Sequence, residues 1–309
     1  MNKTVTNNLN FSLGKNNRLK FLDFITSITS FSKDSDDNSN IFSFSKKEIV
    51  CQNIETIEEE DVIKAYHLYI IEKNNIKEYN FETSENKLIT IKIEHKALIK
   101  LRNLLKINNF EEIIFTAIFE QAKEKNCYFE VNFKLKDFGT NKEFIIFQGL
   151  TSIKDVKFFE NNNCPYIQFD NCSDQLVAFV DMAKSFKEKN KNIKFTISRS
   201  DNEEDEKISL LLKVEHENCR MCFTNLDVKN LEKLDQNFND FYLDTDELHR
   251  VLNSQKKSRS TGIFIKDDLL YFVFSYYEGN DGNDGNQVDG YCALTIVNVR
   301  IKQNVRDSF

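Results

Sequence analysis

The chain has 309 residues, of which 40% are hydrophobic and 12% aromatic, so it is long enough for two domains that each bury a core. Its formal net charge of −7 at pH 7 argues against nonspecific coating of nucleic acid, although an acidic protein can still carry one confined basic surface. No apolar run reaches the roughly 18 residues of a membrane helix, residues 1–13 lack a signal-peptide pattern, and the odd number of cysteines, seven, argues against a disulfide framework.

The first half of the chain alternates strands and helices. Residues 8–13 alternate as a strand, and the helical periodicity of residues 18–31 predicts a helix with a phenylalanine-rich buried face. Residues 41–44 and 49–52 flank a short polar turn and predict a hairpin. A second helix is expected from residue 94 to 107. The further predicted strands of this half are 65–71, 76–81, 88–93, 112–119, 127–135 and 143–150.

The second half repeats this order of elements. An asparagine run ending in the only proline, residues 160–165, predicts a linker between a first domain at 1–159 and a second at 166–309. A helix is expected over 173–189, and Asp244 starts another that runs to about residue 255, with an acidic residue three positions after the cap. The predicted strands are 166–169, 193–199, 207–214, 219–226, 241–243, 262–265, 269–277 and 291–301.

The second predicted helix concentrates positive charge. Lys96, Lys100, Arg102 and Lys106 occur within eleven residues that contain no acid, and they lie away from the arc formed by the helix's leucines. Such a run often serves only as a solvated face, so the basic helix becomes informative only in the context of the whole chain.

The duplicated order of elements resembles that of the sliding clamps, the family of PCNA and its checkpoint relatives. The Hus-type subunit of the nine-one-one DNA damage checkpoint clamp looks most similar. The stretches that carry the resemblance are residues 41–50, the start of the second helix at Ala97-Leu98, residues 207–214 leading into 219–226, and the helix at 245–255.

The resemblance implies an α+β, two-domain sliding-clamp fold, with antiparallel sheets outside and four helices lining the inner face. It also implies a non-enzymatic nuclear subunit that forms a heterotrimeric ring with two other clamp subunits. A clamp loader would place this ring on double-stranded DNA, where it recruits signalling and repair proteins. Two alternatives stay open: a homotrimeric PCNA-like replicative clamp, and a protein-interaction module with no role on DNA.

Clamp geometry predicts that basic side chains opposite each helix's apolar face contact DNA phosphates without reading bases. The second predicted helix, 94–107, has basic residues in these positions. The fourth, 245–255, presents Arg250 and, just beyond its end, Lys257 opposite its leucines. The outward face of the first helix is nearly neutral, and that of the third is acidic. The predicted DNA-binding residues are Lys96, Lys100, Arg102, Lys106, Arg250 and Lys257.

The resemblance also predicts a subunit interface on an edge strand that contains Cys219, Arg220, Met221, Cys222 and Phe223. The spacing Cys219-X-X-Cys222 with His216 nearby superficially suggests zinc, but strand alternation points the two thiols to opposite faces. The Asp/Asn/Gly-rich segment 280–290 lacks the flanking helices of a calcium loop. No nucleophile motif or phosphate-binding glycine loop occurs, so we expect no metal, no cofactor and no catalytic residues.

Overall fold

The structure is a computed structural model. It describes residues 6–15, 17–31, 39–57, 60–72, 76–82, 89–107, 110–120, 127–135, 139–147, 166–170, 173–186, 192–199, 208–214, 218–229, 240–255, 258, 260–266, 269–277 and 291–300. The chain divides into two compact units, one formed by Met1–Lys157 with Glu278–Leu294 and the other by Phe158–Tyr277 with Thr295–Phe309. The predicted linker 160–165 lies outside the described residues, so the predicted domain boundaries stay a prediction.

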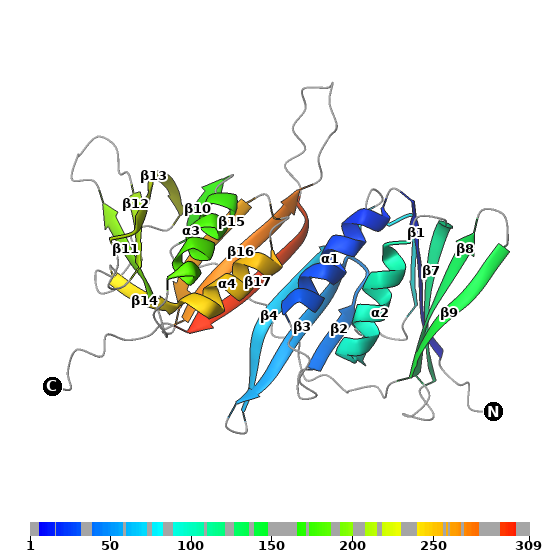
Figure 1. The fold of residues 1–309 in the computed structure, drawn as a ribbon. Coiled ribbons are helices and arrows are strands. Elements are labelled where there is room, and N and C mark those ends of the chain that lie inside the picture. Colours follow the sequence, from blue (N-terminus) through cyan, green and yellow to red (C-terminus); the bar gives the residue numbers. More distant parts are fainter. Residues whose placement is uncertain are drawn as a thin grey trace. The chain divides into compact units, whose positions relative to one another are not determined.

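Unit 1 contains two runs of antiparallel strands (Figure 1). The first run has the order β5-β1-β7-β8-β9, and the second has the order β4-β3-β2-β6. The bounds of these strands are β1 (Thr6–Gly14), β2 (Ser39–Phe44), β3 (Glu48–Ile57), β4 (Glu60–Ile70), β5 (Glu78–Glu82), β6 (Ile89–Ile93), β7 (Phe110–Glu120), β8 (Cys127–Leu135) and β9 (Gly139–Phe147).

Two helices, α1 (Arg18–Phe31) and α2 (His95–Leu105), lie side by side in unit 1. Their apolar faces meet an aromatic core in which the Phe11 and Phe115 rings stack at a centroid distance of 4.4 Å. Phe21 of α1 meets Phe115 edge-on at 5.3 Å and Tyr69 of β4 at 5.4 Å. Offset and edge-on aromatic pairs add stabilisation beyond the buried area. The phenylalanine-rich face predicted for the first helix is thus confirmed as the core of this unit.

A buried polar network crosses the strands beneath α1. His67 of β4 is fully buried, with its Nε2 atom 2.7 Å from Asn53 Oδ1 and its Nδ1 atom 3.3 Å from Ser27 Oγ of α1. Asn53 Nδ2 in turn donates to Asn40 Oδ1 at 2.5 Å. Burial lowers the pKa of His67 to about 3, so the imidazole is neutral at physiological pH.

Unit 2 is built from strands in the order β14-β11-β12-β13-β10-β15-β16-β17, all antiparallel where the register is described. The last strand belongs to this unit from residue 295 onward. The strand bounds are β10 (Tyr166–Asp170), β11 (Asn192–Arg199), β12 (Ile208–Val214), β13 (Arg220–Lys229), β14 (Asp240–Asp244), β15 (Ser260–Lys266), β16 (Leu269–Tyr277) and β17 (Tyr291–Arg300).

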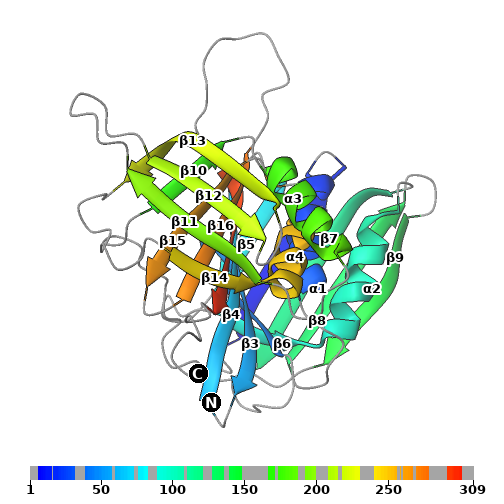
Figure 2. The same cartoon turned by 60° about the vertical axis from the view of Figure 1, so that its left-hand side comes forward.

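The helices α3 (Ser173–Ser185) and α4 (Thr245–Ser254) lie side by side in unit 2 (Figure 2). The predicted cap at Asp244 is confirmed, because its Oδ1 atom accepts hydrogen bonds from the backbone N–H groups of Asp246 at 2.9 Å and Glu247 at 3.0 Å. The predicted apolar arcs of both helices are buried, and they contribute Leu176, Phe179, Val180, Ala183, Leu248, Val251 and Leu252 to the core.

The predicted order of strands and helices is confirmed in both halves, with differences at the boundaries. The strands β3 and β4 are longer than predicted, since β3 runs to Ile57 and β4 begins at Glu60. The helix expected to reach residue 189 ends at Ser185, and residues 187–189 lie outside the described part of the chain.

Candidate nucleic-acid interface

The exposed face of α2 is a stripe of lysines. Lys96, Lys100 and Lys106 are exposed, whereas Leu98, Leu101 and Leu105 on the opposite side are buried. With a rise of about 1.5 Å per residue, the first two lysines are about 6 Å apart along the helix axis, and the third follows about 9 Å further. We call Lys96, Lys100 and Lys106 the α2 lysine stripe. Its ammonium groups suit an anionic partner with repeated charges.

Arg102 differs from these lysines. Its side chain is half-buried, and its NH1 atom donates to Thr29 Oγ1 of α1 at 3.1 Å. The structure thus places this predicted DNA-binding residue at the contact between two helices. Its role in DNA binding stays a prediction, with less of the guanidinium available to a phosphate than at the three lysines.

A second arginine joins the same two helices. Arg18 at the start of α1 is buried, and its NH1 atom donates to the backbone oxygens of Leu105 at 2.8 Å and Ile107 at 3.0 Å. These oxygens belong to the end of α2, where carbonyl groups lack partners within the helix and the helix dipole favours a cation. Arg18 therefore fixes the helix that carries the lysine stripe.

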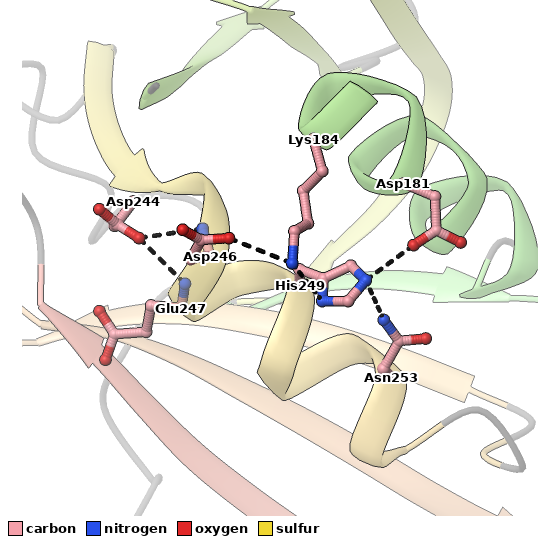
Figure 3. A network of polar contacts seen from close by, with 7 residues as sticks. All are labelled: Asp181, Lys184, Asp244, Asp246, Glu247, His249 and Asn253. Carbon is pink, nitrogen blue, oxygen red and sulfur yellow. Dashed lines mark hydrogen bonds and ion pairs between the residues drawn. The ribbon is translucent and has the colours of Figure 1, made fainter. Parts of the chain in front are cut away.

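The corresponding helix pair of unit 2 carries a polar network instead of a basic stripe (Figure 3). His249 of α4 lies with its Nε2 atom 2.9 Å from Asp181 Oδ1, and the side-chain amide of Asn253 lies 2.6 Å from the same nitrogen. Lys184 of α3 has its Nζ atom 3.3 Å from His249 Nδ1 and 3.1 Å from Asp246 Oδ1. Four charged or polar groups thus link α3 to α4 around one imidazole.

The two ring nitrogens of His249 face different groups, a lysine on one side and a carboxylate on the other. The Lys184 ammonium can only donate hydrogen bonds, so His249 Nδ1 accepts in this arrangement. The network as drawn in Figure 3 contains more carboxylates than lysine or arginine side chains.

The two remaining predicted DNA-binding residues are on or after α4. Arg250 is one-third exposed, and its NH2 atom lies 3.8 Å from Glu247 Oε1, one turn earlier on the same helix. Lys257 lies outside the described residues. Neither position therefore adds a described cation comparable to the α2 lysine stripe, and both stay predictions.

The strand β13 contains most of the predicted subunit interface. Arg220 and Cys222 are exposed and Met221 is half-buried, whereas Phe223 is buried in the unit. Residues Arg220–Phe223 pair with β12 on one side, and β10 pairs only with residues Asp227–Lys229 at the other end of β13. Among the described strand pairs, none joins the second edge of β13 at Arg220–Cys222.

The cysteines at the start of β13 do not belong to a metal site within the described residues. Cys219 Sγ lies 3.9 Å from Met182 Sδ of α3, Cys222 Sγ points toward its neighbour's carbonyl oxygen, and neither cysteine forms a disulfide. Within the described residues, no group of three His, Cys, Asp or Glu side chains is arranged to hold a metal ion. His216 and the segment 280–290 lie outside that part of the chain. The same part holds no helix with the length and hydropathy needed to span a membrane.

Arg18 and His249 were missed as site residues at the sequence level. A signal existed for Arg18, because a cation at a helix start opposes the helix dipole and suggests a partner on another element. For His249 the signal was weaker: Asn253 lies one turn after it, and Asp181 and Lys184 lie one turn apart on α3. Recognising the network required knowing that α3 and α4 are neighbours.

Comparison with solved structures identifies the fold. The chain is similar to the crystal structure of proliferating cellular nuclear antigen (PCNA) from Entamoeba histolytica, with a TM-score of 0.55 and 13% sequence identity, covering 96% of this chain and 99% of that chain. No protein-family model and no curated protein sequence matches the chain. The similarity spans nearly the whole of both chains, so the predicted fold class, α+β with the sliding-clamp fold, is confirmed.

Proposed function

We propose that this chain is a subunit of a ring-shaped DNA clamp that encloses duplex DNA. The observation that carries the proposal is the α2 lysine stripe, which concentrates exposed cations on one helix of a sliding-clamp fold although the chain has a net charge of −7. A clamp acts by enclosure and weak phosphate contacts, so no catalytic residue and no cofactor is needed.

The lysine stripe suits weak, sequence-independent contacts. Long ammonium side chains meet phosphate oxygens without reading base edges, and each phosphate that is neutralised releases counterions. Three such contacts per subunit would give a slope of about −2.7 in a plot of log affinity against log salt concentration. Contacts of this kind hold the duplex loosely enough for the ring to move along it.

Two long strand edges support assembly into a ring. Among the described strands, β9 of unit 1 is the end strand of its sheet and pairs with β8 alone, and in unit 2 β13 has the open edge described above. The other end strands β5, β6 and β14 have five residues each, whereas β9 has nine and β13 ten. Long open edges invite pairing with another chain, and a head-to-tail contact between two different edges can close a ring.

We further propose that the ring is of the DNA damage checkpoint type, with this chain as its Hus-type subunit. Its support is the set of sequence stretches 41–50, 97–98, 207–226 and 245–255. Two other clamp subunits, a clamp loader, signalling and repair proteins and a nuclear location belong to this proposal. A homotrimeric replicative clamp is the second candidate, favoured by the structural similarity to a PCNA.

The mass of the purified chain in solution separates the two candidates. A monomer supports the heterotrimer subunit, and a stable homotrimer supports the replicative type and overturns the checkpoint assignment. The measurement should be repeated over a range of protein concentrations, because a weak homotrimer dissociates on dilution.

Charge reversal tests the DNA-binding role. We expect the triple variant Lys96→Glu, Lys100→Glu, Lys106→Glu to assemble normally but to bind a short linear duplex at low salt much more weakly than the unsubstituted ring does. A matched control reverses three other exposed lysines of unit 1, Lys46, Lys47 and Lys92, with the same change in net charge. Equal loss in both variants would mean that net charge, and not the stripe, controls binding. Unchanged binding of the linear duplex by the first variant would remove the basis for the DNA clamp and leave the protein-interaction module.

A further inference from the structure

The two helix pairs carry opposite charge. In unit 1, α1 and α2 together contain five Lys or Arg residues and one acid, Asp23. In unit 2, α3 and α4 contain four acids and two cations, Lys184 and Arg250. If both pairs line the ring, as the proposed function requires, half of the lining attracts phosphate and the other half repels it.

The few cations of the second pair are engaged with acids. Arg250 lies near Glu247, and Lys184 donates to His249 Nδ1 while lying 3.1 Å from Asp246 Oδ1. Because Asp246 is 83% exposed, solvent screens the Lys184–Asp246 pair, which contributes little stability by itself. The strength of this pair would therefore not prevent a phosphate from competing for the ammonium group.

Repulsion between the neighbouring carboxylates and a DNA phosphate opposes binding at Lys184. A phosphate that approaches Lys184 also approaches Asp246 and the half-exposed Asp181 on the other side of His249. It gains one cation and meets two anions, so the local charge opposes its binding. His249 contributes by position, because its Nδ1 atom holds the ammonium group between the helices. In contrast, α2 contains no acid between His95 and Leu105, so no carboxylate within that helix neighbours Lys96 and Lys100.

We propose that α3 and α4 form a non-binding part of the clamp lining, in which His249, Asp181 and Asp246 withhold Lys184 from DNA. The duplex is then held by the α2 lysine stripe of unit 1 and lies away from the helices of unit 2. This inference rests on the proposed function and specifies which surface of the subunit contacts DNA.

The first test substitutes Lys184 and its acidic neighbours. The measured quantity is the slope of log affinity against log salt concentration for binding of the assembled ring to a short linear duplex. Lys184→Ala is expected to leave the slope unchanged, whereas Lys96→Ala and Lys100→Ala each reduce its magnitude by about 1. The double variant Asp181→Asn, Asp246→Asn should increase the magnitude of the slope by about 1, because Lys184 can then contact a phosphate. Adding Lys184→Ala to the double variant should cancel this increase.

Asp174→Asn is the matched control, because it removes one exposed acid of α3 seven residues before Asp181. It should not create a contact that depends on Lys184. A slope that falls by about 1 in Lys184→Ala alone would overturn the inference, since Lys184 would then already contact phosphate. The inference would also be overturned if the steeper slope of the double variant persisted after Lys184→Ala was added.

Photo-crosslinking provides an independent readout that separates this inference from the proposed function. A photoreactive amino acid is placed at Lys100 of α2 or at Ala178, which is exposed on α3. Crosslinks to DNA from position 100 and not from position 178 are expected. Crosslinks from both positions, or from 178 alone, would overturn the inference and leave the clamp intact. A ring that crosslinks from neither position would overturn the proposed function, and this inference with it.

Discussion

Protonation of His67 should destabilise unit 1 as the pH falls. The side chain is fully buried with two neutral hydrogen-bonding partners, Asn53 and Ser27, and burial lowers its pKa to about 3. In the unfolded chain a histidine has a pKa near 6.5. The unfolded state therefore binds more protons between pH 6.5 and 3, so the stability contributed by neutral His67 is present above this window and is lost as the pH falls through it.

The magnitude follows from the two pKa values. Between pH 7 and pH 5 the unfolded histidine becomes almost fully protonated while the buried one stays neutral, which lowers the free energy of unfolding by about 2 kcal/mol. This figure does not depend on the exact folded value, provided that it lies below about 4. A loss of this size is a large fraction of the 5–15 kcal/mol that typically stabilises a folded domain.

Urea unfolding followed by far-ultraviolet circular dichroism measures the effect at both pH values. His67→Gln keeps a polar side chain but cannot titrate, so the free energy that it loses between pH 7 and pH 5 should be about 2 kcal/mol smaller than in the unsubstituted chain. If the His67→Gln variant and the unsubstituted chain lost equal free energy over this range, a neutral buried His67 would be ruled out.

Two further predictions concern the helices. Arg18→Met keeps much of the apolar stem but removes both hydrogen bonds to the end of α2, so it should lower the free energy of unfolding by about 3 kcal/mol. The control Lys15→Met, at an exposed position three residues earlier, should have little effect, and an equal effect of the two substitutions would contradict the helix-joining role of Arg18. Asp244→Ala removes the α4 cap and should cost about 1 kcal/mol by the same urea measurement, and an unchanged midpoint would show that the cap does not contribute.

The helix faces could be predicted from the sequence because local periodicity determines them. The buried arc of Leu98, Leu101 and Leu105 and the exposed Lys96 and Lys100 follow from the helical repeat alone, without knowledge of any neighbour. The Asp244 cap is equally local, because the side chain and the N–H groups that it accepts from lie within three residues. The helical repeat therefore identifies the face of α2 that carries the candidate DNA-binding lysines.

Contacts between distant elements could not be predicted in this way. Arg18 meets backbone oxygens almost ninety residues away, and His249 meets an α3 carboxylate 68 residues earlier in the sequence. Arg102 illustrates the consequence: helical phase separates it from the leucines, yet the neighbouring α1 engages it through Thr29. The phase of a helix gives the direction of a side chain, and only the packing of its neighbours shows whether that side chain meets solvent.

Retention on circular DNA at high salt tests the central claim, enclosure of the duplex, most directly. High salt removes phosphate contacts but leaves a closed ring in place on a closed circle. We predict that the assembled ring, once loaded onto circular DNA, remains bound at high salt and leaves when a single cut linearises the circle. Equal retention on circular and linear DNA, or release from the closed circle at high salt, would contradict a clamp that holds DNA by enclosure.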